Sequence, residues 1–292
     1  MTNEPRLMLV LAHPDDESLG NGGMVAKYVA EGVEVHLVTA TRGEQGWFGP
    51  DDENPGPEDL GRIREGELLE AAEVLGIREV SFLGYRDGEF DQAPADEVVA
   101  QIVRHIRRVK PHVVVTFDQN GLYGHPDHIA ICQHTTAAVA AAGDPGFSDQ
   151  DGQSAHHVSK LYYMAWTQED VGIYQSAFGE LTMQINGHRR GSAPWQEWAI
   201  TTCIDASAHW RKAWEAITRH RSQLPGYQKL AALPEEAHER LWGRPLYYRV
   251  FSRVSVPQAK EDDLFKGLRE ARLHPRPAPS PDLVGSHASP GA

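Results

Sequence analysis

Short apolar runs alternate with amphipathic stretches through the first half of this 292-residue chain. Apolar runs rich in branched side chains predict four strands, at residues 6–12, 33–40, 80–83 and 113–117. Apolar positions at helical spacing predict the intervening helices, at residues 17–31, 60–75, 95–109 and 127–142. Strands alternating with helices indicate an α/β fold, with a Rossmann-like, mostly parallel sheet and helices on both faces.

The second half has a less regular pattern and predicts a smaller, mixed α+β part. Strands are expected at residues 161–166, 199–204 and 245–251, and a helix at residues 206–223. We expect a catalytic core at residues 1–158, a portion at 159–272 that completes the substrate pocket, and a disordered Pro- and Ser-rich tail at 273–292. Residues 47–59, rich in Gly, Pro and acidic side chains, are expected to form a mobile loop.

Two clusters of polar residues follow two of the predicted strands. The first is Ala12-His-Pro-Asp-Asp-Glu17, and the second is Tyr123-Gly-His-Pro-Asp-His128. In a parallel α/β sheet, ligands bind beyond the carboxyl ends of the strands, near the point where the strand order reverses. We therefore expect the two clusters to form halves of one site.

Histidine and aspartate in this arrangement predict a catalytic metal centre. A catalytic zinc takes three protein ligands and leaves a position for water. His13 and Asp16 lie three residues apart in one turn, and His128 at the start of a later helix can complete the set. Zn²⁺ is the expected ion and Fe²⁺ an alternative, because such sites accept several divalent cations.

The other polar residues of the clusters have chemistry suited to amide hydrolysis. Asp15 is the expected general base for the attacking water. His125, as an imidazolium, is expected to stabilise the oxyanion or to protonate the leaving amine, and Tyr123 is expected to donate a hydrogen bond to the tetrahedral intermediate. Asp127 is expected to orient His125 or a ligand histidine.

Two other interpretations of these residues compete with a metal site. A single His-Pro-Asp cluster is often only a turn, and the repetition of the cluster after a second strand favours the site. Gly20-Asn-Gly-Gly23 suggests a nucleotide-binding module, but the third glycine of the dinucleotide motif is missing and the neighbouring aspartates would repel a pyrophosphate.

Charge and composition narrow the range of partners. The formal net charge of −13 argues against nucleic acid, and no apolar run approaches the length of a membrane span. Cys132 and Cys203 are the only cysteines, so a reducing cytoplasm is the expected compartment. A small-molecule amide is the expected partner, and a homo-oligomer is compatible with the sequence.

The motifs resemble those of the LmbE-like, or PIG-L-like, zinc-dependent deacetylases. The likeness covers roughly residues 6–142 and includes the helix that carries Arg64. It implies His13, Asp16 and His128 as zinc ligands and Asp15 as the base. It also implies His125 as the electrophilic histidine with Asp127 beside it, and Tyr123 at the oxyanion.

The same resemblance suggests a substrate class and two substrate-binding residues. It implies removal of an N-acetyl group from a small N-acetylglucosamine (GlcNAc) conjugate, with an amidase of thiol S-conjugates as the alternative. Arg64 resembles a residue that binds the sugar or its aglycone, and a surface ion pair is the competing interpretation. Asp87 resembles one that binds the sugar hydroxyls, and the role of His220 in Arg219-His-Arg-Ser-Gln223 is left open.

Overall fold

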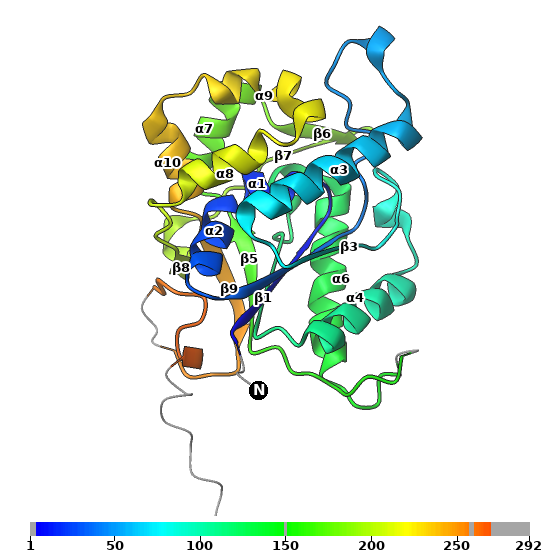
Figure 1. The fold of residues 1–292 in the computed structure, drawn as a ribbon, viewed down its shortest axis with the longest axis vertical. Coiled ribbons are helices and arrows are strands. Elements are labelled where there is room, and N and C mark those ends of the chain that lie inside the picture. Colours follow the sequence, from blue (N-terminus) through cyan, green and yellow to red (C-terminus); the bar gives the residue numbers. More distant parts are fainter. Residues whose placement is uncertain (1–3, 149–150, 257–259, 270–292) are drawn as a thin grey trace, which may run out of the picture.

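A seven-stranded sheet forms the centre of the computed structural model, which describes residues 4–148, 151–256 and 260–269 (Figure 1). The strand order is β3-β2-β1-β4-β5-β9-β8. The first five strands in this order are parallel to one another, β9 is antiparallel to β5, and β8 is antiparallel to β9. The strands are β1 (Arg6–Leu11), β2 (Glu34–Thr39), β3 (Glu79–Phe82), β4 (Val113–Thr116), β5 (Lys160–Ala165), β8 (Thr202–Cys203) and β9 (Leu246–Ser252). The predicted α/β class and the mostly parallel sheet are confirmed.

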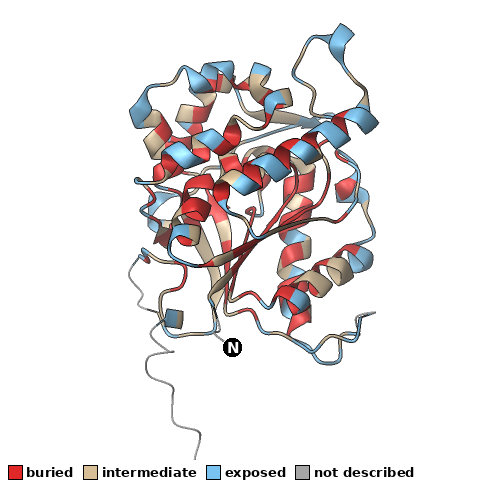
Figure 2. Cartoon of the chain, in the orientation of Figure 1, coloured by how far each residue is buried: buried red, intermediate tan, exposed pale blue. Residues whose placement is uncertain are grey.

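Helices cover both faces of this sheet, so its central strands are buried (Figure 2). On one face α2 (Gly22–Ala30) and α3 (Pro57–Leu75) contact α8 (Trp210–Ile217), and on the other α4 (Ala95–Val109) packs on α6 (Pro126–Ala142). Side chains Leu7 to Leu11 of β1 are fully buried, as expected for a strand covered on both faces.

Most of the remaining elements come from the second half of the chain and lie beyond the carboxyl ends of the parallel strands. The hairpin of β6 (Thr182–Ile185) and β7 (His188–Gly191) forms a separate two-stranded sheet. The others are α1 (Asp16–Leu19), α5 (Gly121–Gly124), α7 (Gln168–Phe178), α9 (Leu224–Ala231) and α10 (Glu235–Gly243), with 3-10 turns η1 (Asp51–Glu53), η2 (Phe90–Gln92), η3 (Glu197–Ala199) and η4 (Arg221–Gln223). Among the described residues, every helix is too short or too polar to span a bilayer.

The predicted continuous helix at residues 17–31 is wrong, because the chain breaks into α1 and α2 around Gly20 and Asn21. The glycines there are needed for close packing. A Cβ on Gly23 would lie 1.8 Å from the carbonyl oxygen of Trp242, and one on Gly22 would lie 2.8 Å from Cβ of Ala213. The glycine run therefore lets α2 lie against α8 and α10, which accounts for it without a nucleotide.

The second half agrees with the prediction only in part. The strands expected at residues 161–166 and 245–251 are present as β5 and β9. The helix expected at residues 206–223 is limited to α8, and the strand expected at 199–204 is limited to β8. Helices α7, α9 and α10 were not predicted; they pack with α8 around Trp210 and Trp242 in a second apolar cluster. β5, β9 and β8 extend the main sheet, and residues 273–292 lie outside the described residues.

The strand order places a crevice between the two motifs. β1 pairs with β2 on one side and with β4 on the other, so the order of the chain reverses between β1 and β4. His13 follows β1, and the loop that carries His125 and His128 follows β4. This is the position where ligands bind in open α/β sheets.

A buried ion pair fixes the antiparallel side of the sheet. Nζ of Lys160 on β5 lies 2.7 Å from Oε1 of Glu261, and both side chains are fully buried. The Tyr162 hydroxyl donates to Oε2 of the same carboxylate over 2.8 Å. We expect Glu261→Ala to lower the free energy of unfolding by about 3–5 kcal/mol in urea titrations, because it leaves the Lys160 ammonium buried without its partner.

The pH dependence of this stabilisation has a defined sign. Burial alone would raise the pKa of Glu261, but its bonds with Lys160, Arg249 and Tyr162 together outweigh burial and lower it. The stabilisation is therefore complete above the unfolded-state pKa of about 4.3, and is lost as the pH falls through the lower folded-state pKa. Exposed Glu235→Ala is the control, with a loss below about 1 kcal/mol; a similarly small loss for Glu261→Ala contradicts the assignment.

Candidate metal centre and active site

The two predicted motifs meet at the crevice between β1 and β4. Nδ1 of His13 lies 3.2 Å from Nε2 of His128. Oδ2 of Asp16 lies 3.8 Å from that His13 nitrogen, and Oδ1 of Asp16 lies 3.7 Å from the His128 nitrogen. Ligand atoms bound at about 2.1 Å to one tetrahedral ion are separated by similar distances. The two imidazole nitrogens have this spacing, and the Asp16 carboxylate approaches each of them through a different oxygen. These donor types suit a divalent cation, and His13, Asp16 and His128 remain the predicted ligands.

Backbone amides fix the Asp16 carboxylate. The N–H groups of Ala12 and His13 donate to its Oδ2 over 3.2 and 2.8 Å, which leaves Oδ1 directed toward His128. Burial raises the pKa of Asp16 to about 7, although the His13 charge opposes the shift. A nearby cation would compensate for the burial of this carboxylate.

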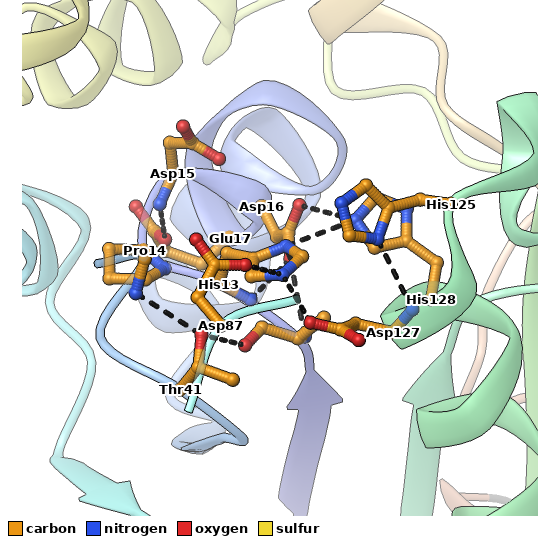
Figure 3. A network of polar contacts seen from close by, with 12 residues as sticks. His13, Pro14, Asp15, Asp16, Glu17, Thr41, Asp87, His125, Asp127 and His128 are labelled. Atoms are coloured by element: carbon orange, nitrogen blue, oxygen red, sulfur yellow. Dashed lines mark hydrogen bonds and ion pairs between the residues drawn. The ribbon is translucent and has the colours of Figure 1, made fainter. Parts of the chain in front are cut away.

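Two carboxylates contact the second ring nitrogen of His13, as the network in Figure 3 shows. Nε2 of His13 lies 3.1 Å from Oδ1 of Asp87 and 3.2 Å from Oδ2 of Asp127. Burial would lower the pKa of His13, but the bonds to Asp127 and Asp87 outweigh it and raise the pKa well above its usual value. A proton held on Nε2 leaves the Nδ1 lone pair free for a metal ion, the arrangement typical of metal-ligating histidines.

Asp87 and Asp127 have further backbone partners. Gln45 N–H donates to Oδ2 of Asp87 over 3.0 Å, and Gly88 N–H donates to Oδ2 of Asp127 over 2.8 Å. Asp127 was predicted to orient His125 or a ligand histidine; its carboxylate contacts His13, and the orienting role stays a prediction. For Asp87, sugar binding stays a prediction beside this observed contact with His13.

His125 lies beside the predicted metal ligands and caps α6. Nitrogens of His13, His125 and His128 all lie within 4.8 Å of one another. Nδ1 of His125 accepts the Asp127 backbone N–H over 3.2 Å, so the ring proton is assigned to Nε2. Burial, with the positive charge of His13, lowers the pKa of His125 to about 4. This environment favours a neutral Nε2–H donor over the imidazolium that the sequence suggested.

Tyr123 is held by a strained turn at the edge of the same cluster. Leu122 has φ 60° and ψ −62°, a conformation that is unusual for a residue with a side chain. Asp118 accepts the Leu122 N–H over 2.8 Å, which stabilises the turn. The Tyr123 ring packs edge-on against His128, with centroids 5.3 Å apart, and burial raises its pKa, so its hydroxyl remains a proton donor at neutral pH.

Asp15 occupies a second strained turn, and its carboxylate points away from His13 in Figure 3. Its φ of 101° lies in the left-handed region. Tyr227 of α9 donates its hydroxyl to Oδ2 of Asp15 over 2.6 Å, and Nη2 of Arg64 reaches the same oxygen at 3.1 Å. Because both donors bind Oδ2, Oδ1 is the oxygen left for a further contact, and the role of Asp15 as general base stays a prediction.

Arg64 connects the segments that follow β1 and β2. Its guanidinium donates to the carbonyl oxygens of Pro14 and Gly43 over 2.6 and 2.8 Å. Only 3% of the residue is exposed, so the alternative of a surface ion pair is wrong. Arg64 lines the pocket, and direct binding of the sugar or aglycone stays a prediction.

A pocket of about 520 Å³ opens above these residues. His13, Asp15, Asp16 and His128 lie at one side. The remaining wall comes largely from apolar and aromatic side chains of the second half, including Met164, Trp166, Tyr174, Phe178, Leu181, Met183 and Tyr227. The second half therefore completes the pocket with residues that the sequence did not single out.

Comparison with known proteins identifies the family. The chain is 36% identical over 293 residues to the 1D-myo-inositol 2-acetamido-2-deoxy-α-D-glucopyranoside deacetylase of Geodermatophilus obscurus, covering 92% of this chain and 99% of the relative. The chain belongs to the PIG-L family. Residues 8–139 match the family described as PIG-L: GlcNAc-PI de-N-acetylase, which confirms the resemblance stated from the motifs. Membership of the PIG-L family makes the protein a metal-dependent N-deacetylase, as predicted.

Two solved structures share the fold of this PIG-L family member. N,N′-diacetylchitobiose deacetylase from Pyrococcus horikoshii has a TM-score of 0.63 and 23% identity, covering 85% of this chain and 84% of that chain. The 4-carboxy-2-hydroxymuconate hydratase from Pseudomonas putida has a TM-score of 0.64 and 19% identity, covering 87% and 99%. Because a hydratase shares the fold, the function follows from the site and the family.

Several residues at the PIG-L site were missed or left without a role by the sequence. Tyr227 bonds to Asp15 from 212 positions away, a contact for which no sequence signal existed. Glu17 and His220 form a buried pair, in which Oε1 of Glu17 lies 2.8 Å from Nε2 of His220. The sequence of the Arg219–Gln223 segment drew attention to His220, but it did not indicate that Glu17 would be its partner.

Proposed function

We propose that this PIG-L deacetylase removes the acetyl group from GlcNAc joined to inositol, in a zinc-dependent reaction. The single observation that carries the metal assignment is the approach of His13, Asp16 and His128 to 3.2–3.8 Å of one another beside Asp15. The relatives named for this substrate include one that aligns with nearly the whole chain. A pocket of about 520 Å³ lies in the size range of small-molecule sites.

The ion would be held by Nδ1 of His13, Nε2 of His128 and a carboxylate oxygen of Asp16. When bound, such a cation lowers the pKa of a water molecule and polarises an amide carbonyl. Zinc is our proposal because nitrogen donors with one carboxylate are a common catalytic zinc set. Fe²⁺ remains the alternative, and elemental analysis of the purified protein distinguishes the two.

The side chains around the ion supply the proton transfers. Asp15 removes a proton from the attacking water as the new C–O bond forms. The Tyr123 hydroxyl and the Nε2–H of His125 donate hydrogen bonds to the oxygen that becomes negative. As the C–N bond breaks, Asp15 returns its proton to the amine nitrogen, and the second proton of the water stays on the acyl oxygen. The products are the free amine and acetic acid, which then ionises to acetate.

A substrate panel tests the proposal. We expect GlcNAc-inositol to be deacetylated with kcat/KM at least about tenfold above that of free GlcNAc, because the aglycone adds contacts with the pocket wall. An S-alkylated cysteine joined through its carboxyl group to the amine of glucosamine provides the amidase alternative, because the amide cleaved in it links the thiol conjugate to the amine and is not an N-acetyl group. Faster turnover of this conjugate, or no preference for the inositol glycoside over GlcNAc, would contradict the proposed substrate.

A further inference from the structure

A buried histidine from the second half of the chain contacts the turn that carries the assigned base. His220 precedes η4, and its residue surface is fully buried. Its Nε2 lies 2.8 Å from Oε1 of Glu17, whose side chain is also fully buried. The two residues are 203 positions apart, so the contact exists only in the folded protein.

The Glu17 carboxylate transmits this contact to Asp15. Its other oxygen, Oε2, accepts the backbone N–H of Asp15 over 3.0 Å. Asp15 has φ 101° and ψ −25°, a backbone conformation that side-chain-bearing residues adopt only when their surroundings hold them there. The backbone bond from Asp15 to Glu17 therefore helps to maintain the strained conformation.

The rest of the segment anchors His220 at this position. The Ser222 hydroxyl donates to Oε2 of Glu67 on α3 over 2.7 Å. Nε2 of Gln223 donates to the carbonyl oxygen of Gly46 over 2.8 Å. One short turn thus fixes His220 through contacts on two other segments of the catalytic half.

Packing alone does not explain a histidine at this position. Within the described part of the chain, Nδ1 of His220 is buried without a hydrogen-bond partner. Burial of an unpaired polar atom is unfavourable, and an apolar side chain of similar size would avoid it. The polar contact with Glu17 is therefore the feature that a histidine provides here.

We propose that His220 is a positioning residue for the hydrolytic reaction, acting through Glu17 to hold Asp15 in its strained conformation. The proposal rests on the assignment of Asp15 as the base. His220 itself touches neither the substrate nor the ion in this scheme. Its Nε2–H holds the Glu17 carboxylate, and the carboxylate holds the Asp15 backbone.

The test compares full-length, metal-loaded variants with GlcNAc-inositol as substrate. We expect His220→Leu to lower kcat on the order of 10²-fold, because small displacements of a catalytic group have effects of this size. KM should change by less than about twofold, since ground-state binding is untouched. His220→Gln, whose amide can still donate to Glu17, should restore kcat to within about tenfold of the wild type.

A double variant shows whether the effect passes through Asp15. If it does, Asp15→Asn/His220→Leu should be no slower than Asp15→Asn alone, because the group being positioned is already absent. Multiplied losses in the double variant would overturn the proposal. Glu17→Met provides a second variant of similar length that cannot accept the Asp15 N–H; if it folds with wild-type kcat, the proposal is likewise overturned.

His238→Leu is the matched control for loss of a buried histidine. His238 is 8% exposed, and its Nε2 lies 2.8 Å from the carbonyl oxygen of Leu230. Its ring stacks on Trp242, away from the Asp15 turn. We expect this variant to lower Tm and leave kcat unchanged. Wild-type kcat in His220→Leu together with an inactive Asp15→Asn would refute only the role of His220. A fully active Asp15→Asn would refute the base assignment itself.

Discussion

Replacement of His128 by alanine is expected to remove the bound metal and to lower kcat/KM by at least about 10³-fold. His128 contributes one of the two facing imidazole nitrogens, 3.2 Å from Nδ1 of His13, and its residue is 2% exposed. Without it, His13 and Asp16 alone would hold the ion. A catalytic metal contributes several kcal/mol to transition-state stabilisation, and each 1.4 kcal/mol corresponds to about a tenfold change in rate.

The measurement combines elemental analysis with initial rates before and after addition of excess Zn²⁺. His134→Ala is the matched control, because His134 lies on the same helix and packs edge-on against Phe90, with ring centroids 5.6 Å apart. That variant should retain a full equivalent of metal and wild-type turnover. If His128→Ala retained stoichiometric metal and normal activity, the ligand set built on the two motifs would be wrong.

The predictable part of the fold is the part in which local pattern and tertiary environment agree. β1 and β4 are continuous apolar strands because both of their faces are covered, and their burial follows directly from their composition. The break between α1 and α2 was not predictable in the same way. It depends on Trp242 and Met164, which approach the glycine run from the second half of the chain.

Some elements were missed even though the sequence carried a local signal. Asn186-Gly187 is a strong marker of a two-residue hairpin turn, and both residues have positive φ between β6 and β7. Thr167 and Asp170 form a capping box at the start of α7. By contrast, α9 begins with Leu-Pro-Gly, and its stability comes from packing on α7 and its neighbours, which no local pattern reveals.

The site, like the fold, has one part that the sequence predicts and one part that only tertiary packing determines. The residues of the two motifs could be grouped because the carboxyl ends of adjacent parallel strands must lie together. The orientation of each side chain could not be predicted, since it depends on partners that are remote in sequence. The Asp127 carboxylate contacts His13 from 114 positions away, and the Tyr227 hydroxyl contacts Asp15 across 212 positions. The sequence thus indicated the chemistry, and tertiary packing determined how each group is held.

Asp15→Asn is expected to lower kcat by about 10²–10⁴-fold while the protein keeps its metal, because the variant loses the proton acceptor and none of the proposed ligands. Asparagine is preferable to alanine here. Asp15 has φ 101°, and asparagine tolerates the left-handed region better than most side chains. Its amide oxygen can also still accept the bonds from Tyr227 and Arg64 that now reach Oδ2.

The decisive measurement is kcat per metal-loaded molecule, with Tm and metal content determined on the same preparations. Tyr227→Phe provides a graded comparison, since it removes one donor to Asp15 and keeps the carboxylate. Hydrogen bonds to charged groups contribute about 1.5–3 kcal/mol, so its loss should be at most about 10²-fold. Turnover of metal-loaded Asp15→Asn within tenfold of the wild type would assign the base to another residue, because a carboxamide cannot accept the proton of the attacking water at neutral pH.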